Sequence, residues 1–241
     1  MSEYSVQSAN RRAFLRQAGV AGAALAIPAA AHGEPHPAAG GHPEVSPLED
    51  LMREHGLLER ILLVYDEFRT RLETGREAPP DVIEEAAHII RHFVEDYHER
   101  LEEDHLFPRF EKPGQLVPVV STLRAQHKAG RAITNWIVAH ASPAGFKTSE
   151  QRILLAGYMH EFSRMYRPHK AREDTVLFPA FHTLVTAKEY DDLGDVFENK
   201  EHELFGANGF EKTIASIAKL EERLEIGDLD HFTPLAVEVA S

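Results

Sequence analysis

The sequence contains an internal repeat, and this repeat restricts the fold more than any other feature of the chain. Segments 98–110 and 169–181 both begin with His, carry Glu four residues later and a second acidic residue directly after it, and end in Leu-Phe-Pro-x-Phe. Segments 51–55 and 123–127 also match, and each ends in His. The offsets between the matching segments are 71 and 72 residues. The chain therefore contains two related units in the same order.

Each unit has the pattern of two helices. Apolar residues recur at steps of three, four or seven, which is typical of helices with one buried stripe. Pro and Gly residues separate the patterns, so helices are predicted over about 47–74, 79–107, 116–140 and 149–178. We expect the second and fourth helices to stop before Pro108 and Pro179, because proline removes a helical hydrogen bond. Four helices with short connections predict an all-α, up-down-up-down four-helix bundle spanning residues 47–182.

Residues 183–241 predict a C-terminal helical extension. Thr186 and Glu189 form a capping-box pattern that favours a helix over about 187–205. A Gly-Ala-Asn-Gly segment separates this helix from a shorter one over about 210–225. We expect these helices either to pack on the outside of the bundle or to mediate contacts in a homodimer.

The first 31 residues resemble an export signal. Arg11-Arg12 is followed by Phe14-Leu15, then by a short uncharged stretch rich in Ala and Gly, and then by three alanines that end at Ala31. This order resembles a twin-arginine signal peptide cleaved after Ala31. The uncharged stretch is too short to anchor the chain, so no membrane span is expected after cleavage, and the location is expected to be periplasmic or otherwise extracytoplasmic. Residues 32–46, rich in His, Pro and Gly, predict a flexible linker.

Composition excludes several classes of function. The 241 residues include 39 acidic and 26 basic side chains, for a net charge of −13, which argues against a nucleic-acid partner. The absence of cysteine excludes disulfides, iron–sulfur clusters, cysteine zinc sites and thiol nucleophiles. The 15 histidines are a first indication of metal chemistry.

The repeated His-x-x-x-Glu pattern predicts a metal site. Residues four apart lie on one helix face, so each imidazole and its carboxylate can converge on one ion. Burying such groups unpaired in a core is costly, and metal coordination removes that cost. Imidazole with carboxylate suits iron, manganese or zinc, and the twofold repeat indicates two ions. The candidate ligands are His55, His98, Glu102, His127, His169 and Glu173.

The ordered set of six residues, with Leu-Phe-Pro after each His-Glu pair, resembles the hemerythrin-like (HHE cation-binding) family over about residues 47–182. The resemblance implies a four-helix bundle that holds two non-haem iron ions. It also implies that the four histidines are terminal nitrogen ligands and that Glu102 and Glu173 bridge the ions.

The sequence departs from the oxygen-carrying hemerythrins at two positions. Those proteins have a second His four residues after the third-helix His, where this chain has Arg131. They also use an Asp five residues after the fourth-helix His. Asp174 has that spacing and is the alternative to Glu173, which we prefer because it mirrors Glu102.

The missing histidine favours reaction with O2, peroxide or NO over simple O2 carriage. Three functions remain open. The chain either binds or senses a small diatomic or peroxide ligand, or acts as a di-iron oxidase or peroxidase-like enzyme, or binds and stores metal without turnover.

Overall fold

The computed structural model describes residues 45–142 and 146–234. The predicted export signal and residues 32–44 of the predicted linker lie outside these ranges. Within them the chain is helical and has no β-strand. The prediction of an all-α bundle with additional C-terminal helices is confirmed.

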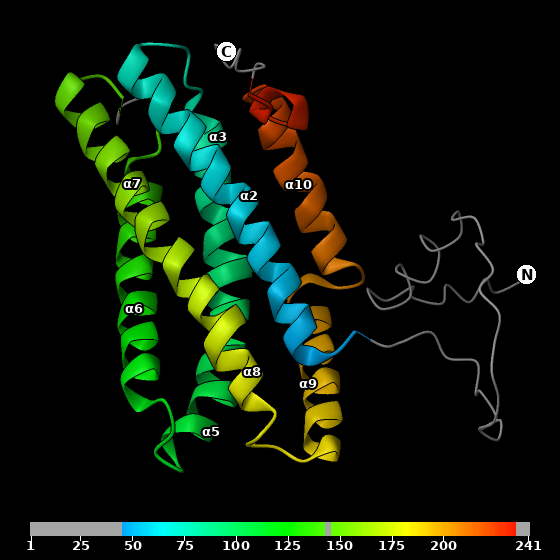
Figure 1. The fold of residues 1–241 in the computed structure, drawn as a ribbon. Coiled ribbons are helices and arrows are strands. Elements are labelled where there is room, and N and C mark those ends of the chain that lie inside the picture. Colours follow the sequence, from blue (N-terminus) through cyan, green and yellow to red (C-terminus); the bar gives the residue numbers. More distant parts are fainter. Residues whose placement is uncertain (1–44, 143–145, 235–241) are drawn as a thin grey trace, which may run out of the picture.

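Four long helical stretches form the bundle, and Figure 1 shows them side by side. The first stretch is α2 (Pro47–Thr74), and the third is α6 (Val117–His140). The second stretch is built from five consecutive segments, which are α3 (Pro80–Ile89), η1 (Ile90–His98), α4 (Glu99–Leu101), η2 (Glu102–Leu106) and α5 (Phe107–Glu111). The fourth stretch is built from α7 (Ser149–Arg172), η3 (Glu173–Leu177) and α8 (Phe178–Phe181).

Local sequence explains where these helices begin and end. The Ser46 side chain accepts a hydrogen bond from the backbone N–H of Glu49, as the sequence predicts for an N-cap. Helix α2 ends at Gly75, whose φ of 71° is a left-handed conformation that glycine adopts without strain. Thr148 and Gln151 form a capping box at the start of α7. Helices α2 and α7 therefore each have at least one end specified by their own residues.

The expectation that two helices stop before Pro108 and Pro179 is wrong. Both stretches continue, to Glu111 and to Phe181. Segments η2 and η3 are π-helical, and each closes with a backbone hydrogen bond across five residues, for example from Phe107 N–H to the Glu102 carbonyl. Each proline then lies in the first turn of a new α-helical segment, where no N–H is needed. The wider π turn thus lets each helical stretch continue beyond its proline.

The Leu-Phe-Pro-x-Phe motifs supply aromatic packing around the bundle centre. Phe110 and Phe181 are fully buried, and their ring centroids lie 5.9 Å apart. The Phe178 ring stacks on the imidazole of His55 at 5.6 Å, and Phe107 lies against His127 at 5.5 Å. The repeated motif therefore closes the space around two of the candidate ligands with apolar rings.

The C-terminal helices pack on the outside of the bundle. Helices α9 (Ala187–Phe205) and α10 (Gly209–Arg223) lie beside α2 in Figure 1. The Arg60 guanidinium donates to Glu221 of α10 at 2.8 Å, and the rings of Phe205 and Phe210 pack against Phe93. A short 3₁₀-helix, η4 (Leu229–Phe232), follows. None of the helices in the described residues combines the length and the apolar character needed to cross a membrane.

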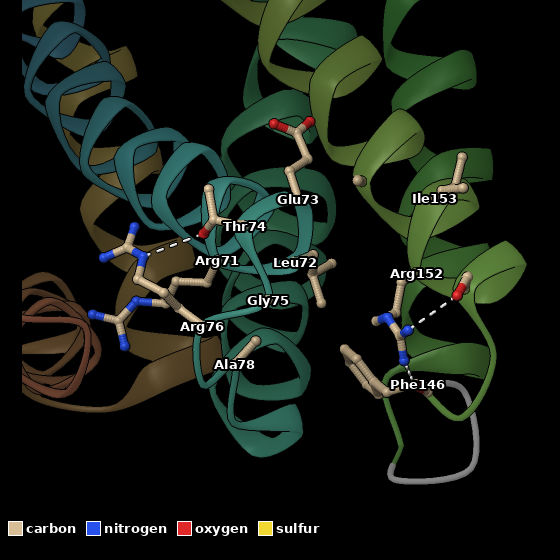
Figure 2. A pocket seen from close by; sticks show the side chains of 12 residues that line it. Arg71, Leu72, Glu73, Thr74, Gly75, Arg76, Ala78, Phe146, Arg152 and Ile153 are labelled. Carbon is tan, nitrogen blue, oxygen red and sulfur yellow. Dashed lines mark hydrogen bonds between the residues drawn. The ribbon is translucent and has the colours of Figure 1, made fainter.

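A cavity of about 840 Å³ lies where α2 ends and α7 begins (Figure 2). Its arginines already have partners, since Arg76 donates to the Thr74 hydroxyl and Arg152 donates to the carbonyl of Phe146. His55 lies 19 residues before Thr74 on the same helix, which is about 28 Å along its axis. This cavity is therefore remote from the candidate metal ligands.

Gly130 of α6 allows Tyr166 of α7 to pack closely. A Cβ atom at residue 130 would lie 2.1 Å from the Tyr166 hydroxyl oxygen and 2.8 Å from its ring. We expect Gly130→Ala to lower the free energy of unfolding by about 1–3 kcal/mol, because the buried tyrosine must move. Gly157→Ala is the matched control, since its Cβ would meet nothing within 4 Å, and it should stabilise α7 by about 0.5–1 kcal/mol. Denaturant unfolding measures both, and equal effects would contradict the packing argument.

Candidate metal centre

The structure brings together the six side chains that the sequence selected. They come from all four long stretches of the bundle, and every one of them is at most 4% exposed. Glu102 and Glu173 are the first residues of the π-helical segments η2 and η3. The equivalent positions in the two units therefore have the same local backbone, and both carboxylates are completely buried.

Each glutamate faces one histidine from each unit. Glu173 Oε2 lies 3.2 Å from His169 Nε2 and 3.3 Å from His55 Nε2. Glu102 lies 3.7 Å from His98 Nε2 through one oxygen and 3.5 Å from His127 Nε2 through the other. The two carboxylates thus connect the two halves of the repeat.

The imidazoles form two neighbouring pairs. The ring centroids of His55 and His98 lie 4.8 Å apart, and those of His127 and His169 lie 4.9 Å apart. Atoms that could hold one cation come together in the group Glu102, His127, His169 and Glu173, and again in the group His55, His98 and Glu102. Because Glu102 belongs to both groups, the arrangement suits two ions that share a carboxylate.

The chemistry of this donor set fits metal ions. All four carboxylate oxygens of Glu102 and Glu173 are buried without a hydrogen bond of good geometry. The polar atoms nearest to these oxygens include the four Nε2 atoms, which have a lone pair when the imidazole is neutral. Buried carboxylates without hydrogen bonds are strongly unfavourable, and a divalent cation bound between them and the imidazoles would remove that penalty.

The Nδ1 atom of each imidazole, which faces away from the centre and is called the outward nitrogen below, also has a hydrogen-bond partner. His55 Nδ1 lies 2.7 Å from Asp174, and His98 Nδ1 lies 2.7 Å from Glu54. His127 Nδ1 lies 3.0 Å from Glu103. His169 Nδ1 lies 2.9 Å from the amide oxygen of Gln126. Since these partners accept the Nδ1 proton, each imidazole in its neutral form presents the Nε2 lone pair to the centre, as metal-binding histidines require.

The sequence pattern does not predict these four partners. Asp174, which the spacing offers as an alternative ligand, contacts His55 Nδ1 on the outward side, and Glu173 lies at the Nε2 side. The signal was present in the repeat, because Glu54 and Gln126 precede matching histidines and Glu103 and Asp174 follow matching glutamates. Their roles depend on how the helices pack, which the sequence pattern does not specify.

Arg131 lies beside the centre and pairs with two acidic residues. Its guanidinium contacts Glu99 at 2.7 Å and Glu103 at 2.8 Å. Glu99 also accepts a hydrogen bond of 2.5 Å from the buried hydroxyl of Tyr166. Glu99, Glu103 and His127 are close enough to hold a cation, and the guanidinium already supplies that positive charge. We therefore assign no third ion to this group.

Comparisons with known proteins indicate a cation-binding domain. Residues 46–137 match the model of the hemerythrin HHE cation binding domain. The chain is 39% identical, over 97% of its length and 94% of theirs, to uncharacterized proteins of Mycobacterium bovis and Mycobacterium tuberculosis. No solved structure matches the chain significantly.

The buried charges interact strongly in the absence of metal. Burial alone would lower the pKa of His55, but its contacts with Asp174 and Glu173 outweigh burial and raise the pKa to about 9. Burial and the neighbouring Glu173 carboxylate raise the pKa of Glu102 well above its usual value. Burial would also raise the pKa of Glu173, but the two adjacent imidazoles hold it well below its usual range. Near neutral pH, the metal-free site therefore carries a proton on His55.

Metal uptake should release the proton on His55. A metal ion needs a neutral imidazole, so binding displaces this proton, and the apparent affinity should rise as pH increases toward the pKa of His55, about 9. Calorimetric titration in buffers of different ionisation enthalpy counts the protons released. Asp174→Asn removes one of the two carboxylates that raise the pKa of His55, so this variant should release fewer protons at the same pH. A binding enthalpy independent of the buffer would contradict this picture.

Proposed function

Because the chain carries a hemerythrin HHE cation binding domain and belongs to one family with its mycobacterial relatives, we propose that it is an exported non-haem di-iron protein that binds or senses O2, NO or peroxide. The observation that carries this proposal is the set of four imidazole Nε2 atoms around two buried carboxylates that lack hydrogen bonds. Manganese or zinc suits the same donors, and the metal content decides among them.

The two histidines of the first unit, His55 and His98, would hold one ion, and those of the second unit, His127 and His169, would hold the other. Glu102 and Glu173 would bridge the ions, since each faces a histidine of both pairs. Bound iron would supply redox chemistry and open coordination positions for a small ligand. Arg131 cannot serve as a ligand, because a guanidinium offers no lone pair and this one is held by Glu99 and Glu103.

Burial favours a small ligand over an organic substrate. Glu102 and Glu173 are 0% exposed, and the aromatic rings of Phe107 and Phe178 cover two of the imidazoles. A diatomic molecule or peroxide can diffuse through a packed helical bundle by small fluctuations, whereas a larger substrate would need a cleft that reaches the buried carboxylates. The protein residues therefore act by excluding water and by fixing the imidazoles.

Loss of one ligand should remove most of the metal. His98→Ala or Glu102→Ala leaves the remaining buried ligands without a complete donor set, so metal content should fall severalfold and the metal-loaded bundle should lose stability. His160→Ala is the control, because His160 is exposed on α7. Elemental analysis of the purified variants measures the effect. Equal metal content in wild type and His98→Ala would contradict the site.

The response to O2 tests the function itself. Protein loaded anaerobically with Fe(II) and then exposed to O2 should change its visible absorption, and the change should reverse when O2 is removed. Rapid irreversible oxidation with turnover of added peroxide would instead identify an enzyme. No spectral response in fully loaded protein would identify metal storage.

Export is part of the proposal and rests on the sequence alone. The support is the Arg11-Arg12 pair, the Phe14-Leu15 pair and the alanines that end at Ala31. Fractionation of cells that express the full chain tests it, with Arg11→Lys/Arg12→Lys as the variant expected to stay in the cytoplasm.

A further inference from the structure

The partners of the outward nitrogens follow the symmetry of the repeat. In each unit, the residue directly before the first histidine accepts a hydrogen bond from Nδ1 of the second histidine. Glu54 does so for His98, and Gln126 does so for His169. The acidic residue directly after each central glutamate accepts a hydrogen bond from Nδ1 of the first histidine of the other unit. Glu103 does so for His127, and Asp174 does so for His55. The two ligand pairs therefore have equivalent surroundings by position.

These equivalent positions do not carry equivalent charges. Both partners of the His55–His98 pair are carboxylates, Asp174 and Glu54. The His127–His169 pair has one neutral partner, the amide of Gln126. Its other partner is a carboxylate oxygen of Glu103 that also accepts from Arg131 at 2.8 Å.

The cationic residue is also specific to the second unit. The position that matches Arg131 in the first unit is Glu59, which pairs with Arg167 and Lys170 of α7. Within residues 45–142 and 146–234, the ion pair of Asp174 is with His55, and no arginine or lysine shares its carboxylate. Two carboxylates therefore hold the first pair of imidazoles, whereas one amide and one carboxylate shared with Arg131 hold the second pair.

This difference affects how tightly each pair holds a cation. A carboxylate that accepts the outward proton makes an imidazole a stronger ligand, and loss of such a partner commonly costs about ten- to a hundredfold in metal affinity. The amide of Gln126 carries no charge, and Arg131 shares with His127 the Glu103 oxygen that accepts from both. The His127–His169 pair is therefore the weaker of the two.

The weaker pair is also the one beside a surface groove. A groove of about 390 Å³ between α6 and α7 has Gln126 and His169 in its lining. The rest of the lining is mostly apolar and consists of Pro118, Val119, Thr122, Leu123, Pro168 and Arg172. Opening the Gln126–His169 hydrogen bond would connect this groove with the second pair of ligands.

We propose that the two metal positions are unequal: the His55–His98 position fills first and retains its ion, whereas the His127–His169 position binds more weakly and exchanges its ion through the groove between α6 and α7. This inference rests on the proposed two-ion centre. It assigns Gln126 as a positioning residue that sets the affinity of one position.

Graded chelation tests the inequality. Full-length protein loaded anaerobically with Fe(II) is dialysed against increasing chelator, and the iron-to-chain ratio is measured by elemental analysis. The wild type should lose one ion per chain at a chelator concentration about tenfold or more below that needed for the other. The rate of the first release should also exceed that of the second.

Reciprocal substitutions identify which position is weak. Gln126→Glu supplies the missing carboxylate, so the ratio of the two chelator concentrations at which the ions leave should shrink by about tenfold or more. Glu54→Gln, which changes charge but hardly changes shape, should weaken the first position so that both ions leave at low chelator. Gln115→Glu, at an exposed turn, adds the same charge as Gln126→Glu and should leave the two releases as in wild type.

The outcomes separate this inference from the proposed function. Two ions that leave together from the wild type, with no effect of Gln126→Glu, would overturn the inequality and leave the two-ion centre standing. A wild type that binds one ion or none per chain would overturn the two-ion centre itself. Because Glu54→Gln nearly preserves volume, a failure of Gln126→Glu to fold would still leave a decisive variant.

Discussion

Two carboxylates that are buried at the centre of the bundle without hydrogen bonds determine how the surrounding structure is arranged. Glu102 and Glu173 cannot be solvated there, so the structure must supply positive charge or neutralise them. Four imidazoles point their Nε2 atoms toward them, four further side chains hold the outward nitrogens, and aromatic rings keep water away. Amphipathic helices account for the bundle as a whole, but the arrangement of side chains at its centre follows from these two carboxylates.

Much of this arrangement could be predicted from the repeat in the sequence. The spacing of His98 to Glu102, and its recurrence at His169, predicts helices that direct both side chains inward, and the structure buries them together. The paths of the helices beyond Pro108 and Pro179 could not be predicted, because apolar periodicity does not distinguish a π turn from a helix end. The partners of the Nδ1 atoms could not be predicted either, because the contact of His55 with Asp174 depends on how two separate helices pack.

The duplicated sequence gives the matching residues Glu102 and Glu173 the same local backbone, so differences between the two ligand pairs arise from individual substitutions around them. Glu54 and Gln126 occupy matching positions and differ only by an amide in place of a carboxylate. Arg131 and Glu59 also occupy matching positions and have opposite charge. A symmetric frame can thus hold two chemically distinct positions without any change in fold, because hydrogen-bond partners and nearby charge tune a ligand that is already in place.

The contacts between the units bear on how such a chain could have arisen. Glu173 faces His55, Glu102 faces His127, and Asp174 and Glu103 each hold an imidazole of the opposite hairpin. A single ancestral hairpin would have lacked these partners and could have completed its donor set only by association with a second copy of itself. The present bundle therefore contains, inside one polypeptide, the contacts that would join two copies of a single helical unit.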